Sequence, residues 1–167
     1  MNANAHDTAH ESMPISALLL GVGGLIPFFG LALWQGFAGD DVLAERLLAG
    51  FVFYAASILS FLGGIGWGLA IGERDPLQRG LSFGVSIVPS LIAWAAAFVN
   101  VQNLGFSLGV LAAAFLLQGF WDWRLVHSGR APRWFGHLRI GLTCAVLCAI
   151  AITWMLQPDL AGIGGTL

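Results

Sequence analysis

Residues 54–70, YAASILSFLGGIGWGLA, contain no charged side chain and many small ones. Small residues recur at every fourth position here, and residues four apart lie on nearly the same face of a helix. These positions are Ala56, Ser60, Gly64 and Gly68, and Gly72 continues the series just beyond the segment. In a bilayer, where lipid is as apolar as leucine, helices associate through such close backbone contact. We therefore predict that this segment is a membrane-spanning helix against which the other helices pack.

The whole chain is too apolar for a water-soluble domain. Of its 167 residues, 57% are hydrophobic and 10% are charged, whereas soluble domains have about 25% charged residues. A folded chain of this size does not have enough interior to bury so much apolar surface. The composition predicts a single all-α integral membrane domain, a bundle of helices whose solvent is lipid.

Hydrophobic segments divide the chain into five predicted transmembrane helices, since about 20 apolar residues cross a hydrocarbon core of about 30 Å. The expected spans are residues 15–37, 47–72, 80–99, 106–121 and 140–156, within a membrane domain of residues 15–157. Residues 1–14 are polar and contain no Lys or Arg, so we expect a disordered tail rather than a signal peptide. Residues 158–167 are expected to be a flexible C-terminal tail.

The distribution of arginines predicts the orientation of the bundle. With five spans, the N-terminal tail, the second loop and the fourth loop share one side of the membrane. That side carries Arg74, Arg79, Arg124, Arg130, Arg133 and Arg139, and the other side carries Arg46 alone. Because basic residues are retained in the cytoplasm, the N-terminus is expected inside and the C-terminus outside. Arginine as the sole basic residue type, with many Ala and Gly, favours a bacterial inner membrane.

Two of the predicted spans contain an internal proline, Pro27 in the first and Pro89 in the third. Proline removes a helix hydrogen bond to the carbonyl four residues earlier, so we expect a kink in each span. Ser86 and Ser90 are expected to bond to the backbone disturbed at Val85. Broken helices also line the substrate sites of transporters, although neither span has an ionisable residue at its middle. A small transporter or channel built around these kinked helices is therefore the alternative function.

The fourth predicted loop, between residues 121 and 140, has the side chains best suited to bind a lipid headgroup or a protein partner. Arginines beside aromatic residues at headgroup depth form sites for anionic lipids. The candidate residues are Asp122, Arg124, Arg130, Arg133, Trp134 and Arg139. The other interpretation is ordinary topology, in which arginines retain the loop, tryptophans anchor the helices and Asp122 is ion-paired and structural.

Nothing in the sequence indicates a catalytic centre, a cofactor or a metal site. G-x-S-x-G, H-E-x-x-H and phosphate-loop motifs are absent, and no predicted span contains a histidine that could ligate haem. Cys144 and Cys148 have no nearby His or carboxylate and are expected to be small packing residues. A net charge of −2 without a basic tract excludes nucleic acid as a partner.

These observations favour a non-catalytic inner-membrane protein that binds or helps assemble other membrane components. Its expected partners are membrane lipids, anionic lipids among them, and another inner-membrane protein or complex. A membrane enzyme that acts on lipids through Asp122 is a third hypothesis.

Four motifs occur in order along the chain: GLIPFFGLA (24–32), YAASILSFLGGIGWGLA (54–70), SIVPSLIAW (86–94) and GFWDWRLVHSGRAPRWFGHLRIGLT (119–143). With them, residues 15–144 resemble the transmembrane-protein-69-like family of small multi-span proteins from bacterial and mitochondrial inner membranes. The resemblance supports the fold and the location, but this domain of unknown function has no established catalytic residue. Positions that match the family pattern are Pro27, Ser60, Gly63, Gly64, Trp67, Gly68, Pro89, Ser90, Trp94, Asp122, Gly129, Pro132, Trp134 and Arg139. Where the family pattern often has a histidine, this chain has Gly66, so it lacks any ligand that the histidine provides.

Overall fold

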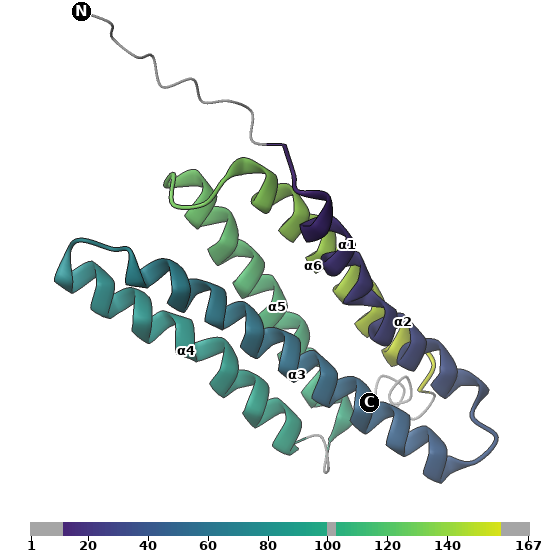
Figure 1. Ribbon diagram of the computed structural model, residues 1–167. Coiled ribbons are helices and arrows are strands. Elements are labelled where there is room, and N and C mark those ends of the chain that lie inside the picture. Colours follow the sequence, from purple (N-terminus) through teal and green to yellow (C-terminus); the bar gives the residue numbers. More distant parts are fainter. Residues whose placement is uncertain (1–11, 100–102, 158–167) are drawn as a thin grey trace, which may run out of the picture.

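A computed structural model describes residues 12–99 and 103–157 (Figure 1). The elements are α1 (Ile15–Gly23), α2 (Leu25–Trp34), the short 3-10 helix η1 (Gln35–Phe37), α3 (Asp41–Ile71), α4 (Pro76–Val99), α5 (Leu104–His127) and α6 (Arg133–Met155). The described part of the chain contains no strand, which confirms the predicted all-α fold. The predicted tails lie outside it, apart from residues 12–14, which precede α1 without being helical.

Five helical units are long and apolar enough to cross a bilayer, and α1, α2 and η1 together form the first of them. Their outer surface carries large apolar side chains; Leu20 and Trp94, for example, are 78% and 69% exposed. Such extensive apolar exposure is characteristic of a surface that contacts lipid. The chain is therefore a multi-pass membrane protein with the predicted number and order of spans.

The second and third membrane helices begin earlier than the predicted spans. α3 begins at Asp41 because Asp40 caps it, accepting a hydrogen bond from the Leu43 backbone N–H at 2.8 Å. α4 begins at Pro76, where the missing N–H of proline removes no helical bond. Hydrophobicity locates the part of a helix that crosses the membrane, whereas capping determines where the helix begins.

The fourth loop is much shorter than the sequence predicts. α5 and α6 extend into it from both sides, so residues 128–132 alone connect them. Gly129 follows the end of α5 in the left-handed region, with φ of 73°, a conformation that glycine adopts without steric cost. Asp122 and Arg139, expected in or beside the loop, therefore lie within helices.

An aromatic cluster joins α2, α3 and α5 at the centre of the bundle. The ring of Phe28 meets Phe51 at 5.6 Å, Tyr54 at 4.9 Å and Phe115 at 6.1 Å between centroids, each time edge-on. Aromatic rings favour this arrangement, because the positive edge of one ring faces the negative face of another. Phe28, Phe51 and Phe115 are each 1% exposed, so the cluster fixes how these helices are spaced.

α3 and α4 lie side by side along their length (Figure 1), but different glycines from those predicted allow their approach. A Cβ atom at Gly63 would lie 2.5 Å from the carbonyl oxygen of Ser86, and one at Gly66 would lie 2.8 Å from its Oγ. At Gly64 and Gly68, a Cβ atom would have no neighbouring atom within 4 Å. Gly63 and Gly66 therefore form the contact with α4.

The predicted row of small residues leaves the contact face because a step of four residues turns about 40° further than one turn of a 3.6-residue helix. Ala56 and Ser60, at the start of the row, are half-buried, whereas Gly64, Gly68 and Gly72 are exposed within the single chain. The row therefore follows the helix surface away from α4.

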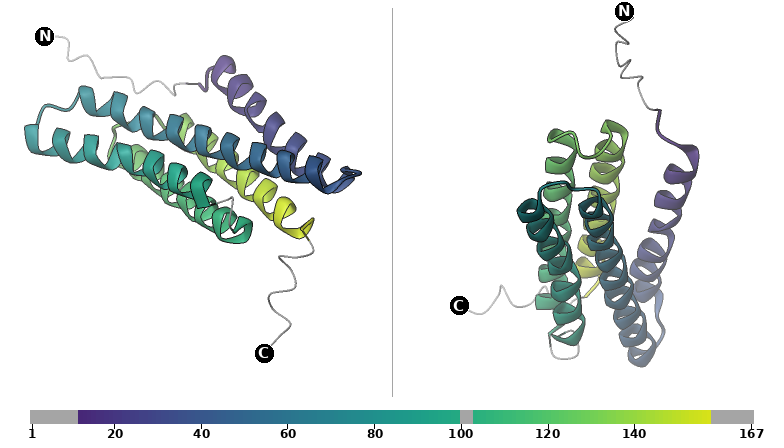
Figure 2. Two further views of the ribbon diagram at one scale, coloured as in Figure 1. Left: turned by 90° about the horizontal axis from the view of Figure 1, so that it is seen from below. Right: turned by 60° about the vertical axis from the view of Figure 1, so that its left-hand side comes forward.

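The first span is interrupted close to its proline. α1 ends at Gly23 and α2 begins at Leu25, so the break falls at Gly24, three residues before Pro27. In Figure 2 (left), the first span lies close to α3 along α2 and diverges from α3 along α1. The interruption therefore allows α1 to pack against α6 while it diverges from α3.

The proline of the third span lies inside the continuous helix α4. The hydroxyl of Ser86 donates to the carbonyl oxygen of Ser82 at 2.7 Å, which is the usual target of a helical serine four residues on. The expected bond to the backbone at Val85 is therefore not formed, and Ser90 donates no hydrogen bond within residues 12–99 and 103–157.

The start of α1, the α3–α4 turn and the α5–α6 loop lie toward the same end of the bundle (Figure 2, right). Successive antiparallel spans produce this arrangement, because every second connection returns to the same side. Most of the arginines belong to this end, which is hereafter called the arginine end.

Candidate functional site

A carboxylate and a guanidinium are paired inside the bundle. Asp122 of α5 and Arg139 of α6 are 2% and 7% exposed, and Arg139 Nε donates to Asp122 Oδ2 at 2.6 Å. Gln118, one turn earlier on α5, donates through Nε2 to Asp122 Oδ1 at 2.9 Å. The ion pairing expected for Asp122 is confirmed. With a donor on each oxygen, the carboxylate is stabilised in surroundings where an unpaired charge would be very costly.

Two polar atoms of this cluster have no partner in the described part of the protein. They are Nη2 of Arg139 and Oγ1 of Thr143, which lies one turn further along α6. Gly119 of α5 allows the close approach here, since a Cβ atom at that position would lie 3.2 Å from Thr143 Oγ1. A buried polar group without a hydrogen bond costs about 1–3 kcal/mol, and a charged group costs more. The cluster therefore contains two buried polar atoms whose hydrogen bonds the described residues do not satisfy.

An apolar cavity of about 390 Å³ adjoins the cluster, and Arg139 and Thr143 form part of its wall. Its size falls within the range of about 300–1,000 Å³ that is usual for small-molecule sites. The rest of the wall is aliphatic, aromatic or glycine, and includes Ala17, Leu20, Phe61, Ile65, Trp134 and Leu142. We refer to this space as the α1–α6 cavity.

The α1–α6 cavity exists because α1 and α3 diverge between the break at Gly24 and the start of α1. Gly21 and Gly24 line it, as do Phe61 and Ile65 on the other side. Figure 2 (left) shows how α1 and α3 separate toward the start of α1. Side chains of α1, α3 and α6 therefore line a space that is open to the outer surface of the bundle, since Leu20 and Phe61 of its wall are 78% and 66% exposed.

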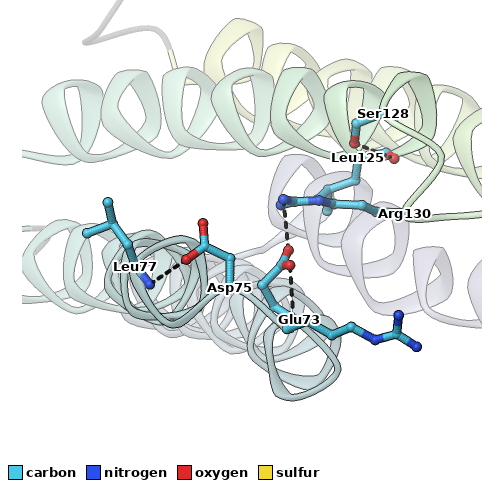
Figure 3. A network of polar contacts seen from close by, with 7 residues as sticks. Glu73, Asp75, Leu77, Leu125, Ser128 and Arg130 are labelled. Carbon is cyan, nitrogen blue, oxygen red and sulfur yellow. Dashed lines mark hydrogen bonds and ion pairs between the residues drawn. The ribbon is translucent and has the colours of Figure 1, made fainter.

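A partly exposed ion pair joins the two loops at the arginine end (Figure 3). Arg130 Nη2 lies 2.9 Å from Glu73 Oε2, and the two side chains are 32% and 23% exposed. Beside this pair, the Asp75 carboxylate accepts from the Leu77 backbone N–H at 3.0 Å and caps the start of α4. The ion pair connects the α3–α4 turn to the α5–α6 loop.

The residues predicted as one headgroup site fall into separate environments. Asp122 and Arg139 are buried together, and Arg130 is held by Glu73. Asp122 and Arg139 are turned inward because α5 and α6 extend beyond the predicted loop, whereas Arg130 lies in the loop itself and is half-buried against Glu73. These three residues are therefore not a free surface for a headgroup.

The remaining three candidates lie nearer the surface. Arg124 and Arg133 are exposed, and neither forms an ion pair within the described ranges. Trp134 is half-buried and lines the α1–α6 cavity. Exposed arginine and cavity wall are thus adjacent at the first residues of α6.

Gln118 and Thr143 belong to the buried cluster, although the sequence analysis did not single them out. Gln118 precedes Asp122 by four residues, and Thr143 follows Arg139 by four. This spacing places each pair on one helix face. In an apolar segment, a polar residue four positions from an ionisable one indicates that the two share a buried polar cluster, and this spacing could have identified Gln118 and Thr143.

The described residues contain no cluster suited to a metal ion, and their two cysteines do not pack as predicted. No group of three or more His, Cys, Asp or Glu side chains there could hold a metal ion. Cys144 and Cys148 are exposed on α6 rather than packed between helices, contrary to the expectation. In a bilayer, this face of α6 contacts lipid or another membrane protein.

A family model described as "Protein of unknown function (DUF3429)" matches residues 13–155. The chain belongs to the DUF3429 family. Its resemblance to transmembrane-protein-69-like proteins is thereby confirmed, since curated proteins with that name are similar to it as well. Transmembrane protein 69 of Xenopus tropicalis is 33% identical, over 85% of this chain and 54% of the relative. The Mus musculus protein of that name is 28% identical, over 86% of this chain and 57% of the relative.

The DUF3429 chain spans somewhat more than half the length of these curated relatives. Both relatives are eukaryotic and are named for their location in a membrane. They support a multi-pass membrane protein of unknown function, and they do not bear on a bacterial inner membrane. No solved structure matches the chain.

Proposed function

We propose that this DUF3429 protein is a non-catalytic membrane protein that binds an amphipathic membrane component in the α1–α6 cavity. The composition of the cavity wall carries the proposal: apart from Arg139 and Thr143, every lining residue is aliphatic, aromatic or glycine. A wall of this kind favours a hydrocarbon chain over a hydrated solute.

Anionic phospholipid is the proposed amphiphile, because the exposed Arg133 adjoins the cavity wall. Arg133 begins α6 directly before Trp134 and Phe135, two residues of the cavity wall. Arg124 is exposed at the same end of the bundle. A lipid with its acyl chain in the cavity would have its phosphate near this rim, where each basic residue contributes about 1 kcal/mol of attraction.

The experiment compares two variants that place a large side chain on α1. Ala17 lines the cavity, whereas its neighbour Ser16 is exposed and does not. The full chain is purified in a mild uncharged detergent, and bound phosphatidylglycerol is quantified by mass spectrometry. Ala17→Phe is expected to retain several-fold less lipid than wild type, and Ser16→Phe to retain the wild-type amount. Equal retention by wild type and Ala17→Phe would overturn the proposal.

The proposed location is an inner membrane, with the arginine end in the cytoplasm. It is supported by the excess of arginine at that end, since basic loops are retained inside. The N-terminus is then cytoplasmic and the C-terminus external. Reporter tags fused to each terminus should report opposite sides, and tags on the same side would contradict an odd number of spans.

Assembly with another membrane protein is supported by the free face of α3. Gly64 and Gly68 are exposed and four residues apart, and no other part of the described chain lies within 4 Å of their Cβ positions. Small residues at this spacing allow two membrane helices to approach closely. Replacing both by leucine should abolish co-purification of a partner after crosslinking in native membranes, whereas the same change at Phe53 and Ser57, which are exposed and also four residues apart, should not.

A second candidate function is transport, and the break at Gly24 is the observation that favours it. Gly24 lines the α1–α6 cavity, so a movement of α1 about the break would change the access to that cavity. Pro27→Ala would restore a helical donor next to the break. Solute flux in vesicles that is unchanged by Pro27→Ala, or absent from wild type, would exclude this function.

A further inference from the structure

We infer that a groove between α4 and α5 binds one anionic phospholipid, with the lipid phosphate at Arg124. The wall of this groove shares no residue with the wall of the α1–α6 cavity. The inference therefore concerns a second site and does not depend on the proposed function. It follows from the shape of the groove, from the different polarity of its two halves, and from the charges at its polar end.

α4 and α5 touch near the start of α5, and the groove lies between them further along. At the contact, the hydroxyl of Ser107 donates to the carbonyl oxygen of Ala96 at 2.6 Å. Closer to the arginine end, two hollows of about 220 and 370 Å³ lie between the helices. Phe120 and Trp121 line both hollows, so the two adjoin. Together they are called the α4–α5 groove.

The half of the groove that lies deeper in the bundle is apolar. Its wall includes Val88, Ile92 and Leu117. Gln118 is the one hydrogen-bonding side chain other than Trp121 that the described residues contribute to this wall, and its Nε2 already donates to Asp122. Leu117 is 63% exposed, so this half is open to the surrounding lipid. A hydrocarbon chain can therefore enter from the side and meet a surface of its own kind.

The half at the arginine end is basic. Arg124, His127 and Arg130 line it, and no Asp or Glu of the described chain does. Arg130 is held by Glu73, whereas Arg124 is exposed and has no ion pair within residues 12–99 and 103–157. One positive charge at this end of the groove is thus free to be matched. The phosphodiester of a phospholipid carries the single negative charge that matches it.

An aromatic stack locates this half at the membrane surface. Trp123 stacks on Phe120 and on His127, with centroid distances of 5.9 and 5.4 Å. All three side chains line the groove and are exposed. Tryptophan is typical of the level at which hydrocarbon gives way to headgroups. The stack therefore places the free charge of Arg124 at the depth of a lipid phosphate.

The length of the groove fits a lipid. Ala114, in the apolar half, and His127, in the basic half, are 13 residues apart on α5. At a rise of 1.5 Å per residue they are separated by about 20 Å. One leaflet of a bilayer, with its headgroups, is about as deep. A phospholipid lying along the groove would thus have its acyl chain beside Val88 and Ile92 and its phosphate at Arg124.

The test is photo-crosslinking of the full chain in nanodiscs. The bilayer is phosphatidylcholine with a small fraction of phosphatidylglycerol that carries a diazirine in the middle of one acyl chain. Mass spectrometry locates the adducts to single residues. Labelling of the groove is compared with labelling of Leu91 and Trp94, which are exposed on α4 outside it. We expect a several-fold excess in the groove, and no excess when the diazirine is carried by phosphatidylcholine instead.

One pair of variants tests the charge. Arg124→Gln removes the free charge of the groove, and Arg79→Gln removes an exposed charge at the same end that does not line the groove. A basic residue near the surface contributes about 1 kcal/mol to the attraction of an anionic lipid. We therefore expect Arg124→Gln to reduce groove labelling about fivefold, and Arg79→Gln to leave it nearly unchanged.

A second pair of variants tests the apolar half. Val88→Trp places a large side chain in the groove, and Ile87→Trp places the same side chain on the exposed surface beside it. Val88→Trp should reduce groove labelling several-fold, whereas Ile87→Trp should not. Arg124→Gln keeps the test decisive if Val88→Trp does not fold.

The outcomes separate this inference from the proposed function. Equal labelling of the groove and of the outer face of α4 in wild type would overturn the inference. Equal effects of Arg124→Gln and Arg79→Gln would show that Arg124 does not hold the phosphate. Ala17→Phe, which obstructs the α1–α6 cavity, should leave groove labelling unchanged, so either proposal can fail while the other stands.

Discussion

The phenolic hydroxyl of Tyr54 on α3 donates a hydrogen bond to the carbonyl oxygen of Gly24, 2.8 Å away. Gly24 lies at the break between α1 and α2, and it also lines the α1–α6 cavity. The ring of Tyr54 packs edge-on against Phe28, so the hydroxyl is held in place. This bond connects the second membrane helix to the point at which the first one turns away from it.

Tyr54→Phe tests this connection. The change removes one hydroxyl and leaves the packing against Phe28 intact, so we expect the free energy of unfolding to fall by about 1 kcal/mol. Thermal unfolding in detergent measures the change. The control is Ser57→Ala on the same helix, where the exposed hydroxyl bonds only to Phe53 O of its own helix and its loss should have little effect. Equal stability of Tyr54→Phe and wild type would show that the bond contributes nothing.

The buried ion pair gives a second prediction. Asp122→Leu or Arg139→Met alone should destabilise the bundle by about 3–5 kcal/mol, because each leaves one charge buried without its partner. The double variant should be much closer to wild type, since it leaves neither charge behind. A double-mutant cycle from unfolding in denaturing detergent measures the coupling. Additive effects of the two changes would mean that the pair acts as two independent residues.

The ion pair at the arginine end should behave differently, because it is partly exposed. Glu73→Gln should cost about 1 kcal/mol or less, which is usual for an exposed pair. The cost should decrease as salt is raised, since salt shortens the screening length between exposed charges from about 10 Å at 0.1 M to about 3 Å at 1 M. Unfolding measured at low and high salt tests this prediction. Asp122→Leu is the comparison, because the Asp122–Arg139 pair that it breaks is buried and salt screens it far less. A large, salt-independent loss in Glu73→Gln would contradict the prediction.

The sequence predicts the number of spans because the bilayer imposes it. Every backbone polar group in hydrocarbon must be bonded within a helix, so each long apolar segment becomes one helix. The ends of those helices depend instead on local capping. Asp40 begins α3 and Gly129 ends α5 by interactions that hydrophobicity does not describe. The predicted spans therefore have the right order, and all except the first are shorter than the helices.

The candidate site depends on how helices are rotated against one another, which one sequence does not specify. Asp122 and Arg139 are 17 positions apart on different helices, and they meet because α5 and α6 turn these faces together. The same rotation leaves Arg124 and Arg133 outside. The residue types of the site were found from the sequence, whereas its division into a buried cluster, a cavity and an exposed rim was not.

The contact between α3 and α4 provides the last prediction, because neighbouring glycines of α3 differ in it. A methyl group at Gly63 would lie 2.5 Å from the Ser86 carbonyl oxygen, so Gly63→Ala must push the two helix backbones apart. We expect a loss of several kcal/mol, as for other overpacked cores. At Gly64 the same methyl group has no neighbour within 4 Å, so Gly64→Ala should be neutral or stabilise the helix by up to about 1 kcal/mol. Unfolding in detergent compares the two. If Gly64→Ala is the more destabilising change, α4 packs against the predicted row of small residues that contains Gly64, and the contact at Gly63 is wrong.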